Sequence, residues 1–315
     1  MTGKSGPDLR PVDVTAIRPA AEVLRGCGLV AVPTETVYGL AARADSESAV
    51  AAIYRAKGRP DFNPLIVHVP TLEAAEAFAV FDERARKLAE AFWPGPLTLV
   101  LPLREGAGIT PAVTAGLPTI ALRWPAHPAM RALLEQSGLP LAAPSANRSG
   151  AVSPTTAAHV ASSLGDKVDL VLDGGACTAG IESTIVAPRD SGWAILRPGP
   201  ITEAEISAII GPAGDGMTST GKIEAPGQLA SHYAPGKPVR LGACEAEDDE
   251  FLIGFGPVQG HTTLSESGDL AEAAARLYAC LHLAAADAKP RVAIAPVPEE
   301  GIGAAINDRL RRSAA

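Results

Sequence analysis

The stretch from residue 30 to residue 69 constrains the fold more than any other part of the chain. The stretch begins with the apolar run Leu29 to Val32, whose length and β-branched residues predict a buried strand. Pro33 to Thr36 interrupts the run, and a helical pattern follows that should end at Gly58. A second apolar strand is predicted from Leu65 to Val69. We therefore expect a strand–turn–helix–strand unit of the right length for a parallel crossover.

Polar residues stand at the ends of this unit, namely Thr34, Thr36, Lys57, Arg59, Asn63 and His68. Cations near a helix C-terminus, such as Lys57 and Arg59, ordinarily complement the helix dipole. The alternative is a phosphate clamp, in which the lysine supplies a point charge and the arginine a bidentate fork. A histidine in an apolar strand, such as His68, is more commonly a satisfied core residue than a ligand. The residues alone leave these alternatives open.

Length and composition predict two α/β domains. The chain has 315 residues, of which 47% are apolar, so it exceeds one ordinary core and has ample side chains to bury. Residues 14–210 are predicted to form a large mixed sheet flanked by helices. Residues 211–238, rich in Gly, Pro, Ser and Thr, are predicted to be a linker, and residues 239–315 a small α/β domain. Residues 1–13 are expected to be a loose tail.

Apolar periodicity and turn residues predict the remaining elements. Helices are expected at 20–25, 73–78, 83–92, 129–136, 155–163, 203–210 and 269–288, and in the final segment around 307–310. Strands are expected at 97–101, 119–123, 139–143, 168–172, 183–187, 193–196, 239–241, 251–255 and 292–295.

Charge and cysteine usage exclude several classes of function. A net charge of -8 argues against bulk binding of nucleic acid or of an anionic membrane. The four cysteines are far apart and form no Cys-x-x-Cys, so neither a zinc site nor a disulfide framework is expected. The N-terminus lacks an apolar signal core, and no stretch approaches the roughly 20 apolar residues of a membrane span. We expect a cytoplasmic protein with reduced cysteines.

Further polar residues follow predicted strands. Ser145 and Asn147 come after the strand at 139–143, Arg123 closes the strand at 119–123, and Arg197 follows another. Ser and Asn are ordinary turn residues. In an open α/β sheet, however, ligands bind beyond the carboxyl ends of strands. A charge such as Arg123 at the end of an apolar strand is costly unless it is paired, and a carboxylate ligand would be a natural partner.

Residues 216–223 look like a phosphate-binding loop but are rejected as one. Ile223 stands where the metal-holding Ser or Thr belongs, no strand precedes the motif, and Pro226-Gly227 comes too soon for a helix.

Taken together, the motifs of the chain resemble those of the YrdC-type threonylcarbamoyl-AMP synthases in their long, two-domain form. The matching segments are Pro33 to Leu40, Lys57 to Pro60, Asn63 to Leu65, Trp93 to Thr98, Ala121 to Pro125, Ala143 to Asn147, Ser183 to Val186, Leu196 to Gly199, Pro226-Gly227, Ser231 to Pro235 and Asn307 to Leu310. They cover nearly the whole chain in the right order, and their joint occurrence is specific. The departures are small: Asp61 replaces a commonly small polar residue and Gln228 a commonly apolar one.

This resemblance implies a YrdC-like catalytic domain, a linker that can serve as a lid, and a small Rossmann-like α/β C-terminal domain. It also implies an activity, the synthesis of L-threonylcarbamoyl-AMP and pyrophosphate from L-threonine, bicarbonate or CO2, and ATP, with Mg2+ accompanying the nucleotide and no dedicated metal ligands. The product would supply a separate transferase that makes N6-threonylcarbamoyladenosine in tRNA. Tight nucleic-acid binding and membrane association are not expected.

The resemblance also assigns roles to individual residues. Lys57, Arg59, Ser145 and Asn147 would be catalytic. The ATP-binding residues would be Lys57, Arg59, Asn63, Thr119, Ser145, Ser153, Arg197 and Tyr233. The threonine pocket would be formed by Thr34, His68, Arg123 and Ser183, with Thr36 in support.

Two other functions stay open at this stage. One is a non-catalytic module that binds RNA or nucleotides through a basic concave face. The other is carbamoyl transfer to an acceptor other than threonine on the same scaffold.

Overall fold

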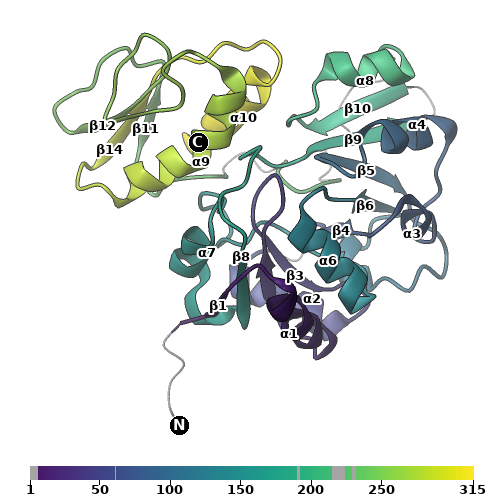
Figure 1. Cartoon of the computed structure of the whole chain (residues 1–315). Helices are drawn as coiled ribbons and strands as arrows, with labels where there is room; N and C mark the ends of the chain where they lie inside the picture. Colours follow the sequence, from purple (N-terminus) through teal and green to yellow (C-terminus); the bar gives the residue numbers. More distant parts are fainter. Residues whose placement is uncertain (1–5, 61, 190–191, 215–223, 229–231) are drawn as a thin grey trace.

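The computed structural model describes residues 6–60, 62–189, 192–214, 224–228 and 232–315. Within these ranges the protein contains a ten-stranded mixed sheet and a four-stranded parallel sheet, each with its own helices. Figure 1 shows the smaller sheet and its helices as a separate layer beside the larger domain. The expected α/β fold class is confirmed. Asp61 and the loop-like motif at 216–223 lie outside the described residues.

The larger sheet has the order β1-β8-β2-β3-β7-β4-β6-β5-β9-β10. Its strands are β1 (Asp8–Pro11), β2 (Val30–Val32), β3 (Gly39–Arg43), β4 (Ile66–His68), β5 (Leu97–Pro102), β6 (Thr119–Arg123), β7 (Leu141–Ala142), β8 (Leu170–Asp173), β9 (Thr184–Arg189) and β10 (Gly192–Arg197). The helices are α1 (Val14–Arg25), α2 (Glu47–Lys57), α3 (Leu72–Glu76), α4 (Glu83–Phe92), α5 (Pro111–Thr114), α6 (Pro128–Ser137), α7 (Ala157–Leu164) and α8 (Glu203–Ile210), with a short 3-10 turn at Gly165–Lys167.

The predicted parallel crossover is wrong, because a strand that the sequence analysis missed lies within it. β3 pairs antiparallel with β2, and β7 then pairs antiparallel with both β3 and β4. Three successive reversals make β4 run opposite to β2, and the two strands are not neighbours. The turn between β2 and β3 is closed by the Thr34 hydroxyl, which donates to the Val37 carbonyl at 2.7 Å. A strand made mainly of small residues lacks the β-branched side chains that mark strands in sequence.

The N-terminal segment is also more ordered than the loose tail that was expected. Residues 8–11 form β1, which pairs in parallel with β8 at the sheet edge. Helix α1 begins at Val14, capped by the Asp13 carboxylate, and continues through Pro19. The sequence analysis began this helix only after that proline, since proline commonly bounds a helix.

The C-terminal domain is a parallel sheet of order β11-β14-β12-β13 with two helices. Its strands are β11 (Val239–Leu241), β12 (Glu250–Gly254), β13 (Thr262–Thr263) and β14 (Arg291–Ile294), and its helices are α9 (Leu270–Ala286) and α10 (Gly303–Ser313). Only the two-residue strand β13 was not anticipated among them. The parallel sheet with covering helices agrees with the expected small α/β domain.

The two domains share a continuous apolar contact. The buried apolar cluster that forms the core of the C-terminal domain also includes residues from outside it. These are Val37, Val152 and Ile181 of the larger domain, and Tyr233. His159 on α7 stacks on His282 of α9, with ring centroids 3.8 Å apart. The smaller domain is therefore docked on the larger one through buried side chains. Within the described ranges, no helix has the length and apolar character needed to cross a membrane.

Candidate active site

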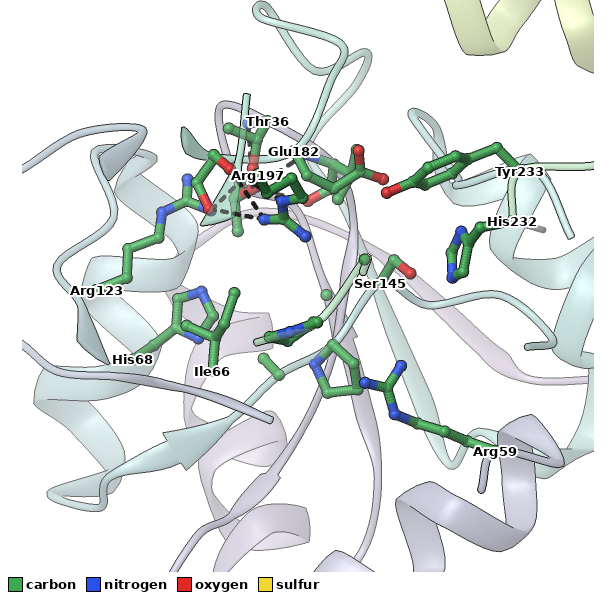
Figure 2. A pocket seen from close by; sticks show the side chains of 18 residues that line it. Thr36, Arg59, Ile66, His68, Arg123, Ser145, Glu182, Arg197, His232 and Tyr233 are labelled. Carbon is green, nitrogen blue, oxygen red and sulfur yellow. Dashed lines mark hydrogen bonds between the residues drawn. The ribbon is translucent and has the colours of Figure 1, made fainter. Parts of the chain in front are cut away.

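A narrow pocket lies across one face of the large sheet and under the segment that joins the two domains. Its lining is Thr34, Thr36, Val37, Gly39, Arg59, Ile66, His68, Arg123, Ala143, Pro144, Ser145, Glu182, Ser183, Arg197, Pro226, Gly227, His232 and Tyr233 (Figure 2). Ile66 and His68, two residues apart on β4, point to the same face of the sheet. The sequence analysis expected a site beyond the carboxyl ends of strands. The lining does include residues that end strands, namely His68 on β4, Arg123 on β6 and Arg197 on β10.

Arg123, at the end of β6, is already paired with a carboxylate of the chain itself. Its guanidinium lies 2.5 Å from the Glu35 carboxylate and donates to the Thr36 hydroxyl at 3.0 Å and to the Gly95 carbonyl at 3.2 Å. The Glu35 carboxylate also accepts the Ala126 N–H at 3.1 Å. Burial opposes ionisation of Glu35, but the Arg123 charge and these hydrogen bonds outweigh it and lower the pKa of that carboxyl. The pair is therefore charged and rigid.

Lys57, the last residue of α2, is directed at the loop after β7. Its ammonium donates to the carbonyls of Ser145 and Asn147, both at 2.6 Å. Lys57 is only 3% exposed, and burial, followed by repulsion from Arg59, lowers its pKa well below the ordinary value. The Asn147 amide donates to the carbonyls of Arg148 and Ala151, while its Oδ1 atom has no hydrogen-bond partner among the described residues. Lys57 thus holds the loop that carries Ser145 against the pocket.

Arg59 enters the pocket from the loop after α2. Gly58 ends the helix in the left-handed conformation, at φ 59°, and so turns the chain toward the site. The Arg59 guanidinium donates to the Pro64 carbonyl at 3.0 Å and, weakly, to the Asn63 carbonyl at 3.4 Å. Burial lowers the pKa of Arg59 to about 10, which leaves it a cation at neutral pH. No carboxylate is paired with it in the described structure, in contrast to Arg123.

Ser183 and Arg197 form a second polar group at the pocket. Arg197, at the end of β10, donates to both the carbonyl and the hydroxyl of Ser183 at 3.0 Å. The Ser183 hydroxyl is also hydrogen-bonded to the Thr98 hydroxyl at 2.8 Å. Glu182, the neighbour of Ser183, accepts from the Ser153 hydroxyl at 2.6 Å. These bonds fix the side chains around one wall of the pocket.

Two buried histidines line the pocket in the neutral form. Burial lowers the pKa of His68 and of His232 to about 3. Both rings have an Nδ1 atom with no hydrogen-bond partner among the described residues. Figure 2 shows His68 near Arg123 on one side of the pocket and His232 near Tyr233 on the other, with Ser145 between them. Neutral rings with an unused nitrogen can accept or donate a hydrogen bond to a polar ligand.

The segment between the domains covers the pocket. Pro226, Gly227, His232 and Tyr233 form this cover, and Tyr233 is 1% exposed with a left-handed φ of 65°. Gln228 closes a turn in the cover by accepting the N–H groups of Glu224 and Ala225. The free volume beneath is about 50 Å3, comparable to one or two water molecules, each with a share of about 30 Å3. Ligand pockets of drug-sized molecules run from roughly 300 Å3 upward, so the space left beneath the cover is small.

The structure brings most of the predicted site residues together. Eight of them line the pocket: Thr34, Arg59, His68, Arg123, Ser145, Ser183, Arg197 and Tyr233. Four other predicted site residues are buried behind the lining and do not face the pocket themselves. They are Lys57, Asn63, Asn147 and Ser153. Thr119 stands at the opposite end of β6 from Arg123, about 13 Å away along the strand at roughly 3.3 Å per residue.

Sequence reasoning gave no role to three residues at the pocket, Glu35, Glu182 and His232. Glu35 and His232 lie inside motifs that were noted, so adjacency to Thr34 or Tyr233 could have suggested them. Nothing in the sequence marks Glu182, since its partners Tyr278 and Arg309 lie far away in the C-terminal domain. No cluster of three or more His, Cys, Asp or Glu that could hold a metal is found in the described part of the chain.

Comparisons with known proteins agree with this geometry. Residues 22–199 match the family model Sua5_yciO_yrdC, described as "Telomere recombination", and residues 201–315 match "Threonylcarbamoyl-AMP synthase, C-terminal domain". The threonylcarbamoyl-AMP synthase of Bacillus subtilis (strain 168) is 41% identical over an alignment covering 95% of this chain and 92% of that protein. The chain belongs to the two-domain threonylcarbamoyl-AMP synthases. The resemblance seen in the sequence is confirmed.

Archaeal members of the synthase family are similarly close. The threonylcarbamoyl-AMP synthase of Pyrococcus abyssi is 40% identical, with 94% of this chain and 93% of that protein aligned. A crystal structure titled as P. abyssi Sua5 complexed with L-threonine superposes with a TM-score of 0.88 at 36% identity, covering 98% of this chain and 96% of that one. As a member of this family the chain is an enzyme, an ATP-using synthase.

Proposed function

We propose that the pocket condenses L-threonine, bicarbonate or CO2, and ATP into L-threonylcarbamoyl-AMP and pyrophosphate. The product supplies the threonylcarbamoyl group of tRNA N6-threonylcarbamoyladenosine through a separate transferase. The observation that carries the proposal is the lining itself, which combines three buried arginines, Arg59, Arg123 and Arg197, with neutral histidines under a closed cover. Such a lining suits a ligand that carries several negative charges and a reaction that must be shielded from water.

The reaction needs two bond-forming steps. The neutral amine of threonine attacks the carbon of CO2 and loses a proton, which gives an N-carboxylate. An oxygen of that carboxylate then attacks the α-phosphorus of ATP, and pyrophosphate leaves. Because neither step requires a covalent bond to the protein, catalysis consists of alignment and stabilisation of charge.

The proposed threonine end of the pocket is built by Thr34, His68, Arg123 and Ser183. Arg123, already held by Glu35 and Thr36, would bind the amino acid carboxylate with a donor that Glu35 leaves free. His68 stays neutral, so its unpaired Nδ1 atom can hydrogen-bond the amine or the growing carbamate without repelling a cation. Thr36 supports the arrangement through Arg123.

The proposed nucleotide end is built by Arg59, Ser145, Arg197 and Tyr233. Arg59 has no carboxylate partner among the described residues and is the cation best placed to neutralise phosphates. Lys57, Asn63, Asn147 and Ser153 would act from behind the lining, where Lys57 orients the loop of Ser145 and Asn147. Thr119 would take part where the nucleotide extends along β6 beyond the pocket.

Mg2+ would enter as the nucleotide complex. Glu182 lines the pocket and is paired with Arg309, while Glu35 lies behind the lining and is paired with Arg123, so the lining fits phosphate oxygens better than a metal. Mg2+ is commonly held mainly by substrate phosphates and water, and it would supply charge neutralisation there. Tight binding of tRNA is not part of the proposal, in keeping with the net charge of -8.

The decisive experiment is pyrophosphate release from MgATP with threonine and bicarbonate each added and omitted. Release that requires both substrates supports the synthase. Release that ignores threonine would point to carbamoyl transfer to another acceptor. No release by folded protein would leave a nucleotide-binding module as the better account, and salt-dependent RNA affinity would then be measured next.

A further inference from the structure

Four consecutive residues, Gly180 to Ser183, run from the core of the C-terminal domain to the wall of the pocket. A Cβ atom at Gly180 would overlap the backbone of Ala274 and Ala275 in α9, so a glycine permits the close approach of the segment to that helix. Ile181 is fully buried in the apolar cluster of the C-terminal domain. Ser183, two residues later, lines the pocket and contacts Arg197. The segment is a direct physical link between the two domains.

Within this link, the Glu182 carboxylate is hydrogen-bonded to side chains of both domains. One oxygen of its carboxylate accepts from Ser153 at 2.6 Å, and the other accepts from Tyr278 at 2.8 Å and from Arg309 at 2.9 Å. Burial opposes ionisation of Glu182, but Arg309, Arg197 and the two hydroxyl donors prevail and lower its pKa to about 2. A buried carboxylate with these partners is ionised and held in one orientation.

Arg309 on α10 joins both sides of the link. It is fully buried, binds Glu182 through Nε, and donates through Nη2 to the carbonyl of Pro198, the residue after Arg197. His282 on α9 adds a contact at 3.1 Å to the carbonyl of Ser153. The C-terminal domain therefore touches the residues beside Ser183 and Arg197, and Ser153 as well.

The charges explain why this contact matters for a bound nucleotide. Glu182 lines the pocket and lies close enough to Arg197 for the two charges to influence each other. Figure 2 shows the Glu182 and Arg197 side chains next to one another, with Tyr233 directed toward them. If Arg309 were absent, the carboxylate would lose its ion pair and would act on the nearby cations Arg197 and Lys57. It would then offset the charge proposed for the phosphates and repel them.

We propose that Glu182 is a positioning residue through which Arg309 and Tyr278 of the C-terminal domain set the nucleotide end of the pocket. Glu182 holds Ser153 and the segment that carries Ser183 in place. Arg309 pairs with the Glu182 carboxylate and so keeps the negative charge of Glu182 directed away from Arg197. This inference rests on the proposed function and assigns a role to the C-terminal domain in nucleotide binding.

The test compares the full-length protein with Arg309→Met, Glu182→Gln and the double variant. The readouts are the Kd of MgATP by calorimetry and the KM values for ATP and threonine in pyrophosphate release. Arg309→Met should weaken ATP binding by about fivefold to a hundredfold, the usual range of coupling between sites, with a smaller change in the KM for threonine. The double variant should recover most of the ATP affinity, because the isolated negative charge has been removed.

Two further variants keep the test decisive. Arg311→Met removes a surface arginine of the same helix, paired only with Glu299 in the described structure, and should match the wild type. Tyr278→Phe removes one hydrogen bond to Glu182 while keeping the ring, and should shift ATP affinity in the same direction by less, even if Arg309→Met folds poorly.

The possible outcomes separate this inference from the proposed function. Folded variants that bind ATP as tightly as the wild type would overturn the inference, as would a double variant no better than Arg309→Met. The proposed function fails instead if the wild type releases no pyrophosphate, and the calorimetric comparison still decides the role of Glu182 in that case.

Discussion

The guanidinium of Arg123 lies 2.5 Å from the carboxylate of Glu35 at the edge of the closed pocket. The cation proposed to bind the threonine carboxylate is therefore partnered before any substrate enters. A second carboxylate arriving at Arg123 experiences both attraction to the arginine and repulsion from Glu35. If threonine binds Arg123 as proposed, Glu35 should limit how tightly it binds while keeping Arg123 oriented.

Glu35→Gln should lower the KM for threonine severalfold. The glutamine can still accept the Ala126 N–H and one Arg123 donor, but it no longer repels the substrate carboxylate. The KM for ATP serves as the internal control and should change less. A higher KM for threonine in this variant would mean that orientation of Arg123 by the full charge outweighs the repulsion.

Lys57→Met should reduce both turnover and stability. The Lys57 ammonium donates to two carbonyls, those of Ser145 and Asn147. Leaving buried acceptors unsatisfied costs about 1–3 kcal/mol each, so we expect the free energy of unfolding to fall by about 2–6 kcal/mol. Urea denaturation measures this loss. Lys87→Met, which breaks a surface pair with Glu83, is the matched control and should cost less than about 1 kcal/mol.

Arg59→Ala should give the complementary pattern, a large loss of turnover with a smaller loss of stability. Within the described structure its side chain makes one hydrogen bond of 3.0 Å and one weak bond of 3.4 Å, so few groups are left unpaired. Removing one group that stabilises developing charge in the transition state commonly lowers turnover by about 100-fold or more. Initial rates of pyrophosphate release and urea denaturation together decide the case. Near-wild-type turnover in both Arg59→Ala and Lys57→Met would contradict the proposed site.

The stability of the domain interface should fall as the pH drops from 7 to 5. Burial, followed by the neighbouring His282, lowers the pKa of His159 to about 4, against about 6.5 in an unfolded chain. Between these values the unfolded state binds the proton and the folded state does not, so stability rises with pH. His159→Phe keeps a ring to stack on His282 but removes this titration. Its free energy of unfolding should therefore decline less than that of the wild type between pH 7 and pH 5, and an equal decline would refute the assignment.

Much of the site could be anticipated because its residues stand in local sequence patterns. Arg123 and His68 at the ends of apolar strands, and Lys57 and Arg59 after a helix, could be singled out from the residues, but their roles in the site came from the resemblance to the synthase family. The sheet topology was harder, because β3 is made mainly of small residues and reverses the chain inside an apparent crossover. The residues that end β4, β6 and β10 still line the pocket, as their positions after apolar runs suggested.

The contacts between distant segments were out of reach of sequence reasoning. Glu182 is paired with Arg309, which lies 127 residues away in the sequence. No local sequence pattern indicates a buried carboxylate whose partner belongs to another domain. Glu35 was similarly taken as part of a turn, since the Arg123 that binds it is 88 residues away. Both pairings arise from how the domains and strands pack, which a single sequence does not display.

Gly180→Ala should separate the effect of domain docking from that of backbone strain. Gly180 and Gly138 both have left-handed φ values, 70° and 67°. A Cβ at Gly138 meets nothing within 4 Å, whereas one at Gly180 overlaps the backbone of α9. Gly138→Ala should therefore cost about 1–2 kcal/mol of stability, the strain of a left-handed residue, and leave pyrophosphate release intact. Gly180→Ala should cost more and also weaken ATP binding, because α9 must move away from the segment that carries Glu182. Equal losses of stability in the two variants, with unchanged ATP affinity, would show that the close approach at Gly180 has no part in setting the pocket.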